Sequence, residues 1–299
     1  MPSLRSRLFY RAMKLFFGYI LRPGLSIETY RKAANQPVFE PMPRGVRCET
    51  GQLNGVTGEW ITPSTILPNR ALLYLHGGGY VLRTPQVHRV LVARLAQATQ
   101  CRAFIADYRL APENPYPAAI EDALVAYRGM LDSGYSASQI VIAGDSAGGG
   151  LTAAVLLSLR DAGEPLPAAA CLMSALLDCT FSSPNIPELQ KRDPYLRLSD
   201  LSMMAKHYYG AYDPRHPLIS PVFADMRGLP PLLIYAGENE VLRDDTTCFA
   251  ENASRAGVKV TLKVWEGMIH AFPIFAGFIP EGKTAIKDIG AFFQNHLPA

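Results

Sequence analysis

Six short apolar runs, each the length of a β-strand, alternate along this chain with segments the length of a helix. The runs cover residues 71–75, 103–106, 140–143, 168–173, 232–235 and 258–264. Helices are expected near residues 86–99, 117–131, 147–162, 242–256 and 282–296. This order predicts an α/β fold with a mostly parallel sheet and helices on both faces. A hairpin at residues 46–49 and 56–61 adds two strands and brings the sheet to about eight.

One connection breaks this alternation. Residues 176–230 contain no run typical of a strand, and residues 201–209 are expected to be helical. Insertions of this length in a compact domain usually have a function. We therefore expect residues 176–220, together with residues 1–45, to form a helical cap at the carboxyl edge of the sheet, where open α/β folds bind ligands. Residues 46–175 and 221–299 then form the main α/β domain.

The run at residues 140–143 leads into Gly144, Asp145, Ser146, Ala147 and Gly148, and then into an apolar helix. A Gly-x-Ser-x-Gly sequence between a strand and a helix is typical of a nucleophile elbow, because the glycines permit a tight turn that raises the serine hydroxyl above the sheet. The alternative is a tight turn without a catalytic role, since so short a pattern also arises by chance. We predict that Ser146 is the nucleophile of a hydrolase.

Three successive glycines, Gly77 to Gly79, follow His76 at the end of the run at residues 71–75. Without side chains in this turn, backbone N–H groups can point at a ligand oxygen, as an oxyanion hole requires. We predict that Gly77, Gly78 and Ala147 are the N–H donors and that His76 supports the loop. A flexible loop or a phosphate cradle is the alternative, although the Gly-Lys-Ser/Thr ending of a phosphate-binding loop is missing.

The chain has six histidines, and position in the predicted fold selects one of them as the general base. His270 lies in the loop after the last strand, where the order serine, acid, histidine places the base of a catalytic triad. The others are expected in the glycine loop, on a surface helix, in the cap and at the end of the chain (His76; His88; His207 and His216; His296).

Four carboxylates follow the strand at residues 232–235, namely Glu238, Glu240, Asp244 and Asp245. The acid of a triad has to leave the strand end before the next helix carries the chain away, which favours Glu240. Asp244 is the alternative acid. Both Asp244 and Asp245 are otherwise expected in the first turn of a helix, where carboxylates suit the positive end of the helix dipole.

Four motifs, in order along the chain, make it similar to a known family. Residues 76–79 read His-Gly-Gly-Gly, residues 107–113 read Asp-Tyr-Arg-Leu-Ala-Pro-Glu, residues 116–123 extend that stretch, and residues 144–149 read Gly-Asp-Ser-Ala-Gly-Gly. Over about residues 70–298 the chain resembles the hormone-sensitive-lipase family of bacterial carboxylesterases. It departs from the family at Glu240, where Asp is usual, and at Ala175, where Pro is frequent.

This resemblance implies an α/β-hydrolase fold with a helical cap, hydrolysis of short- to medium-chain acyl esters, and no metal or cofactor. Amide or lactone hydrolysis and lipase activity are alternatives, because they use the same catalytic groups. A non-catalytic ligand receptor on the same scaffold is a further alternative. His270 argues against it, because such receptors differ from the enzymes at the triad histidine.

Composition and charge argue against other classes of protein. Lys and Arg exceed Asp and Glu by 29 − 26 = 3, and no basic stripe interleaved with aromatic residues follows the body of the chain, so a nucleic-acid partner is not expected. The five cysteines are scattered without Cys-x-x-Cys pairs. That spacing predicts reduced thiols in a cytoplasmic protein rather than a metal or redox site.

Residues 1–32 carry seven basic residues against one acidic residue, with large apolar side chains between them. Arg11 and Lys14 interrupt the apolar run that a secretory signal needs, and no run reaches the roughly 20 apolar residues of a membrane span. We expect an amphipathic helix that acts as a lid over the substrate pocket. Weak membrane contact and simple packing of a terminal helix are the alternatives.

Residues 258–264 read Val-Lys-Val-Thr-Leu-Lys-Val. Such alternation is typical of a half-buried strand with its lysines pointing outward. As the last run in the chain, it is expected to lie at the edge of the sheet. Because an exposed edge has to be protected or paired, we expect a homodimer through this strand.

Overall fold

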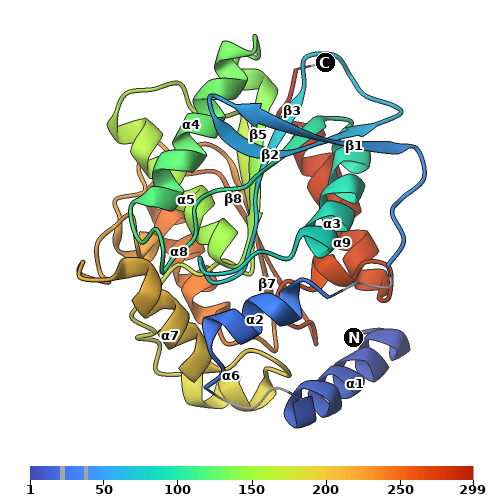
Figure 1. Ribbon diagram of the computed structural model, residues 1–299, viewed down its shortest axis with the longest axis vertical. Coiled ribbons are helices and arrows are strands. Elements are labelled where there is room, and N and C mark those ends of the chain that lie inside the picture. The colour runs from blue at the N-terminus through green and yellow to red at the C-terminus, as the bar shows by residue number, and fades with distance from the viewer. Residues whose placement is uncertain (21–23, 37–39, 299) are drawn as a thin grey trace.

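The computed structural model describes the chain except residues 21–23, 37–39 and 299 (Figure 1). Two of these gaps fall in the predicted N-terminal cap segment, and that part of the prediction lies outside the described residues. The strands are β1 (Val46–Leu53), β2 (Val56–Pro63), β3 (Ala71–Leu75), β4 (Arg102–Ala106), β5 (Ile140–Asp145), β6 (Ala169–Met173), β7 (Leu232–Gly237) and β8 (Val260–Trp265). The α-helices are α1 (Leu4–Ile20), α2 (Ile27–Ala34), α3 (Pro85–Thr99), α4 (Ala118–Asp132), α5 (Ala147–Asp161), α6 (Ile186–Arg192), α7 (Leu198–Tyr209), α8 (Arg243–Arg255) and α9 (Pro280–Gln294).

The eight strands form one sheet in the order β1-β2-β4-β3-β5-β6-β7-β8. β2 pairs antiparallel with both β1 and β4, and every other neighbouring pair is parallel. The predicted α/β fold with a mostly parallel sheet of about eight strands is therefore confirmed, and the six apolar runs lie on β3 to β8. Residues 176–230 contain no strand, as predicted.

Successive side chains of the central strands belong to two separate hydrophobic cores, because alternate residues of a strand point to opposite faces of the sheet. In β3, Leu73 and Leu75 belong to the core under α4, α5 and α8, whereas Leu72 and Tyr74 belong to the core under α3 and α9. Figure 1 shows these two groups of helices on opposite sides of the sheet. Each fully buried aliphatic side chain contributes roughly 1.5–3 kcal/mol to folding, so continuous apolar runs are the pattern that a sheet covered on both faces requires.

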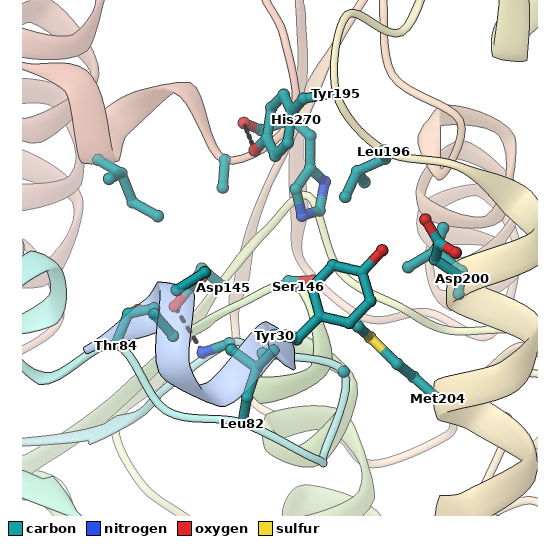
Figure 2. Close-up of a pocket in the computed structure, with 18 of the residues that line it drawn as sticks. Tyr30, Leu82, Thr84, Asp145, Ser146, Tyr195, Leu196, Asp200, Met204 and His270 are labelled. Carbon is teal, nitrogen blue, oxygen red and sulfur yellow. Dashed lines mark hydrogen bonds between the residues drawn. The ribbon is translucent and has the colours of Figure 1, made fainter. Parts of the chain in front are cut away.

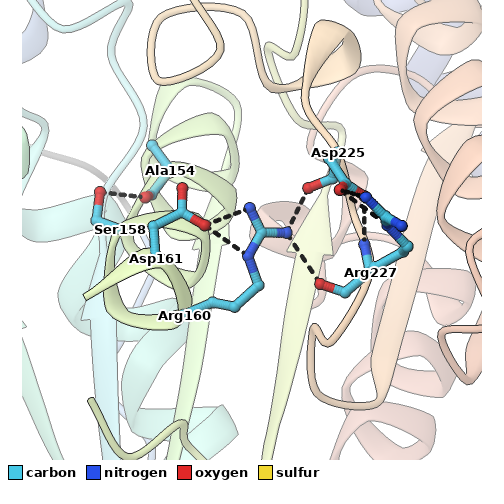
Figure 3. Close-up of polar contacts among 6 residues, drawn as sticks. All are labelled: Ala154, Ser158, Arg160, Asp161, Asp225 and Arg227. Atoms are coloured by element: carbon cyan, nitrogen blue, oxygen red, sulfur yellow. Dashed lines mark hydrogen bonds and ion pairs between the residues drawn. The ribbon is translucent and has the colours of Figure 1, made fainter. Parts of the chain in front are cut away.

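The last turn of α5 holds the segment that returns from the insertion to β7. The guanidinium of Arg160 donates to the backbone carbonyls of Asp225 and Arg227 and pairs with the carboxylate of Asp161 (Figure 3). Ser158, one turn from the end of the helix, donates to the carbonyl of Ala154 at 2.8 Å. The helix that begins beside Ser146 is thus tied at its other end to the segment that precedes β7, the strand that leads toward Glu240.

The helices α1, α2, α6 and α7 gather at the end of the molecule to which the parallel strands lead (Figure 1). Arg31 of α2 is one of the side chains that tie this group to the main domain. Its guanidinium donates to the carbonyls of Val81 at 2.7 Å and Ala111 at 2.9 Å and forms two hydrogen bonds with the carboxylate of Glu113. These contacts fix α2 over the loop that follows the three glycines.

β8 corrects one prediction. It lies at the edge of the sheet, as expected, but only the beginning of the predicted run is covered. Leu262 and Val264, predicted to face inward, are 37% and 42% exposed, whereas Val258 is buried and Val260 is half-buried against the core under α4, α5 and α8. Alternation along the sequence cannot show how much of the length of an edge strand is covered.

Within the described residues, no helix is both long enough and apolar enough to cross a lipid bilayer.

Candidate active site

Ser146 stands in a strained turn between β5 and α5. Its backbone adopts φ 53° and ψ −123°, a conformation that L-residues rarely adopt, and it immediately precedes the first turn of α5. Gly144 and Gly148, on either side of the serine, have no room for a side chain. A β-carbon on Gly144 would lie 2.2 Å from the carbonyl oxygen of Gly148, and one on Gly148 would lie 2.0 Å from that of Leu75. The predicted strand-turn-helix context of the serine is therefore present.

His270 and Glu240 form a hydrogen-bonded pair that is closed to solvent. Nδ1 of His270 lies 2.9 Å from Oε2 of Glu240, and Oε1 of Glu240 accepts the backbone N–H of Gly237 at 3.0 Å. The side chain of Glu240 is fully buried. Burial by itself lowers the pKa of His270, but the hydrogen bond with Glu240 and the charge of that carboxylate raise the pKa above its ordinary value.

Asp244, the alternative acid, lies elsewhere. Its carboxylate accepts hydrogen bonds from Ser183 and Asn185, each at 2.8 Å, and pairs with Arg243 at 3.0 Å. Asp244 and Asp245 occupy the first turn of α8, the position expected for them. The structure thus places Glu240, and not Asp244, against the imidazole.

The glycine loop corrects the prediction for one oxyanion donor. The N–H of Gly77 already donates to Oδ1 of Asp145 at 3.0 Å, so it is not available to a substrate oxygen. The N–H groups of Gly78, Gly79 and Ala147 have no acceptor among the described residues. Gly78 and Gly79 adopt φ values of 125° and 61°, and both line the same cavity as Ser146. Gly79 therefore replaces Gly77 as a candidate donor.

Ser146, His270 and the glycine loop meet at one cavity of 380 Å³. In Figure 2 the imidazole of His270 points down toward Ser146, and the hydroxyl of Tyr30 points toward Asp200; all four residues line the cavity. Burial and a hydrogen bond with Asp200 raise the pKa of Tyr30. Most of the remaining wall is apolar and comes from the N-terminal helices, the glycine loop, the insertion and the loop after His270 (Phe17, Ala33, Ala34, Leu82, Leu196, Leu201, Met204, Ile274).

No three His, Cys, Asp or Glu side chains in the described part of the chain are grouped so that they could hold a metal ion.

The chain is similar to known proteins over most of its length. A family model described as the alpha/beta hydrolase fold matches residues 72–274. The chain is 44% identical over 238 residues to an acetyl-hydrolase of Streptomyces hygroscopicus, covering 80% of this chain and 79% of that protein. It is 38% identical to an esterase of Acinetobacter venetianus, covering 81% and 80% of the two chains. A crystal structure described as an esterase from the bacterial hormone-sensitive lipase family is 37% identical over the full length of both chains, with a TM-score of 0.92.

The chain belongs to the hormone-sensitive-lipase family of α/β-hydrolases. The family and the fold predicted from the four motifs are therefore confirmed. The relatives match roughly four-fifths of this hydrolase in sequence, and the structure matches all of it, including the N-terminal helices and the insertion.

Asp145, inside the serine motif, anchors the glycine loop of this hydrolase. It is buried and accepts hydrogen bonds from Tyr74 at 2.6 Å and from the N–H of Gly77, and Nε2 of His88 lies 3.3 Å from Oδ1. Burial acts to raise the pKa of Asp145, but the charge of His88 and these hydrogen bonds hold it at about 2. The carboxylate fixes the distance between the elbow and the loop.

His88 and His76 both lie near Asp145, and their positions can be compared with those predicted from the sequence. His88 was expected on a surface helix, but only 3% of it is exposed, because α3 turns this residue toward β5. His76 stacks on the ring of Tyr108 at 4.2 Å and contacts the carbonyl of Gly77 through Nδ1 at 2.8 Å. Burial lowers the pKa of His76 to about 3. A neutral ring packed behind the loop suits the supporting role predicted for it.

Asp193 of the insertion is a buried carboxylate that the sequence analysis missed. It accepts the backbone N–H groups of Val241 at 3.0 Å, Leu196 at 2.9 Å and Tyr195 at 3.1 Å. The hydroxyl of Tyr195 in turn donates to the carbonyl of His270 at 2.7 Å. Burial raises the pKa of Asp193 to about 6. Asp193 and Tyr195 therefore join the insertion to the two loops that carry Glu240 and His270. In the sequence, only the Asp-Pro step at residues 193–194 indicates an ordered turn there.

Proposed function

We propose that Ser146, His270 and Glu240 act as a catalytic triad that hydrolyses carboxylic esters of short to medium acyl chain length through an acyl-enzyme. The proposal depends above all on the buried hydrogen bond between His270 and Glu240 in the wall of the cavity that Ser146 also lines. The enzyme class predicted from the sequence, a carboxylic ester hydrolase, agrees with the names of the relatives, an acetyl-hydrolase and an esterase.

In the proposed first step, Oγ of Ser146 attacks the ester carbonyl while Nε2 of His270 removes the hydroxyl proton. The N–H groups of Gly78, Gly79 and Ala147 stabilise the negative oxygen of the tetrahedral intermediate. His270 then protonates the departing alcohol, which leaves the acyl group on Ser146. Water, activated by the same imidazole, attacks this acyl-enzyme and releases the acid. The carboxylate of Glu240 accepts the N–H of Nδ1, so that Nε2 is free to accept a proton.

The size and apolar wall of the cavity support small acyl groups over long ones. A cavity of 380 Å³ lies at the lower end of the volumes typical of small-molecule sites. The direct test is a series of p-nitrophenyl esters from acetate to palmitate. We expect kcat/KM to peak among the short and medium acyl chains, and a maximum at palmitate would contradict the proposed chain length. A fluorophosphonate should label Ser146, as peptide mass spectrometry would show.

The rate should rise with pH along a single limb set by His270. Only the neutral imidazole accepts a proton, and Glu240 raises the pKa of His270. The midpoint of kcat/KM is therefore expected above the ordinary pKa of a histidine, with activity lost as the pH falls through it. Initial rates with p-nitrophenyl acetate across roughly pH 5 to 9 would measure it. A midpoint below the ordinary value would contradict the assigned pair.

Removal of the Arg31 contacts should weaken substrate binding. In Arg31→Gln the hydrogen bonds to Val81, Ala111 and Glu113 are lost, so α2 and the cavity residue Tyr30 are held less firmly. We expect kcat/KM to fall about tenfold, mainly through KM, since hydrogen bonds to charged groups contribute roughly 1.5–3 kcal/mol. The matched control is Arg128→Gln, which breaks a similar two-bond pair with Glu164. Equal effects of the two variants would refute the anchoring role.

The remaining predictions stand as proposals. The exposed Leu262 and Val264 at the edge strand β8 support a homodimer, and light scattering at micromolar concentration would test it. All five cysteines are free, which supports a cytoplasmic location. The division into a cap, residues 1–45 and 176–220, and a catalytic domain, residues 46–175 and 221–299, is supported by the cavity walls, to which both parts of the cap contribute.

A further inference from the structure

One face of α1 is docked firmly against the main domain. Phe9 packs on the ring of Phe275 at a centroid distance of 5.0 Å. The hydroxyl of Tyr10 donates to the carbonyl of Arg192 at 2.7 Å, and the N–H of Ser3 donates to Glu281 at 2.6 Å. Figure 1 places the helix at the periphery of the molecule. The helix therefore has a fixed inner face, and its orientation determines which residues point outward.

The outward face of α1 carries an apolar stripe. Leu4, Leu8 and Leu15 are spaced by four and seven residues, so they share one side of the helix. They are 65%, 55% and 64% exposed. Phe16 is 56% exposed but lies about a quarter turn away, on the side of the helix where Arg5 lies. Single exposed leucines are ordinary on protein surfaces. Here three leucines align on one side of a helix, and within the described residues none of them belongs to or packs against a hydrophobic core.

Basic side chains flank this stripe on both sides. By helical spacing, Arg7, Arg11 and Lys14 lie along one edge of the stripe and Arg5 lies along the other. All four are exposed, and α1 contains no acidic residue. None of the four forms an ion pair within the described ranges of the chain. The nearest partner of Lys14 is the backbone carbonyl of Lys191, at 3.2 Å.

An apolar stripe between rows of unpaired cations is the pattern of a helix that lies in the interface of a bilayer, with its apolar side chains below the headgroups and its cations among the phosphates. We propose that the outward face of α1 binds the surface of a bilayer that contains anionic lipids. A second copy of this chain does not fit the face, because a symmetric contact would bring the two sets of four cations together.

The position of α1 also joins this surface to the cavity. Phe17, at the inner side of the helix, lines the cavity wall and packs on Tyr195 at 5.4 Å. A protein seated on α1 would hold the cavity wall beside the bilayer, where apolar esters concentrate. This step alone depends on the proposed esterase function. Binding to the bilayer does not depend on it.

The test is flotation of the full-length protein with vesicles of phosphatidylglycerol mixed with phosphatidylcholine. Each basic residue near an anionic surface contributes about a fivefold factor in partitioning. The variant Arg7→Gln, Arg11→Gln, Lys14→Gln should therefore bind on the order of 100-fold more weakly than the wild type. The matched control, Arg44→Gln, Arg47→Gln, Lys259→Gln, removes the same charge from exposed positions at the opposite end of the sheet and should bind like the wild type.

Three further measurements complete the test. A Leu8→Ser, Leu15→Ser variant should also lose binding, high salt should weaken binding of the wild type, and vesicles of phosphatidylcholine alone should bind poorly. The α1 variants and the charge control should keep wild-type hydrolysis of dissolved p-nitrophenyl acetate, which shows that they are folded. Ser146→Ala should bind vesicles like the wild type. Vesicle binding can therefore be interpreted even if the esterase proposal fails.

Some results would overturn the membrane proposal. Wild-type protein that does not float with anionic vesicles would do so, as would equal loss of binding in the α1 variant and its control. If Leu8→Ser, Leu15→Ser changed the mass in solution from dimer to monomer without altering flotation, the stripe would be a protein contact instead.

Discussion

Ser146→Ala should abolish ester hydrolysis while leaving the fold intact. Loss of the nucleophile removes the covalent step itself, and in serine hydrolases of this kind it lowers kcat by on the order of 10⁶-fold. The hydroxyl of Ser146 makes no hydrogen bond with the described residues, and alanine fits the same space. We therefore expect turnover of p-nitrophenyl acetate to fall to the level of the solution reaction, with the unfolding midpoint unchanged within error.

The matched control is Ser174→Ala, a second buried serine with a backbone φ of 50°. Its hydroxyl accepts the N–H of Ala271 at 2.9 Å, so this variant disturbs the histidine loop without touching the nucleophile. Its activity should fall far less than that of Ser146→Ala. If Ser146→Ala retained more than a small fraction of wild-type turnover, another group would have to attack the ester and the triad would be wrong.

The site was best predicted from the sequence at positions where the structure accommodates only one type of residue. The glycines at 144 and 148 admit the turn because a β-carbon would meet a backbone oxygen at 2.2 Å or 2.0 Å. The strand-turn-helix context followed from these residues and from the buried runs around them. The choice of Glu240 over Asp244 followed from chain position alone, and the contacts of Asp244 with Ser183 and Asn185 agree with it.

The role of a residue could not be predicted from the sequence where that role depends on a partner far away along the chain. Nothing adjacent to Gly77 indicates that its N–H is taken by Asp145, because 68 residues separate them. The sequence predicts His88 at the surface, because helical periodicity locates an apolar face but not the buried carboxylate toward which a polar residue can turn. Asp193 contacts Val241 across 48 residues, and no local pattern marks such a pair.

Replacement of Glu240 by Gln should lower kcat by on the order of 10⁴-fold, although it changes only one atom. The corresponding acid-to-amide change in a serine protease triad has an effect of this size, because the histidine adopts the wrong tautomer. If the amide oxygen of the introduced glutamine accepts the N–H of Gly237, its NH₂ group faces Nδ1 of His270. Nδ1 must then be the acceptor, and Nε2 carries the proton and cannot take one from Ser146.

Two further readouts distinguish this mechanism from loss of structure. Because Glu240 raises the pKa of His270, the residual activity of Glu240→Gln should have its midpoint at lower pH than that of the wild type. Asp244→Asn, which neutralises a carboxylate four residues away that does not touch the imidazole, should keep both the wild-type rate and the wild-type pH midpoint. A Glu240→Gln enzyme with an unshifted midpoint would show that the carboxylate does not govern the protonation of His270, even if its rate were low.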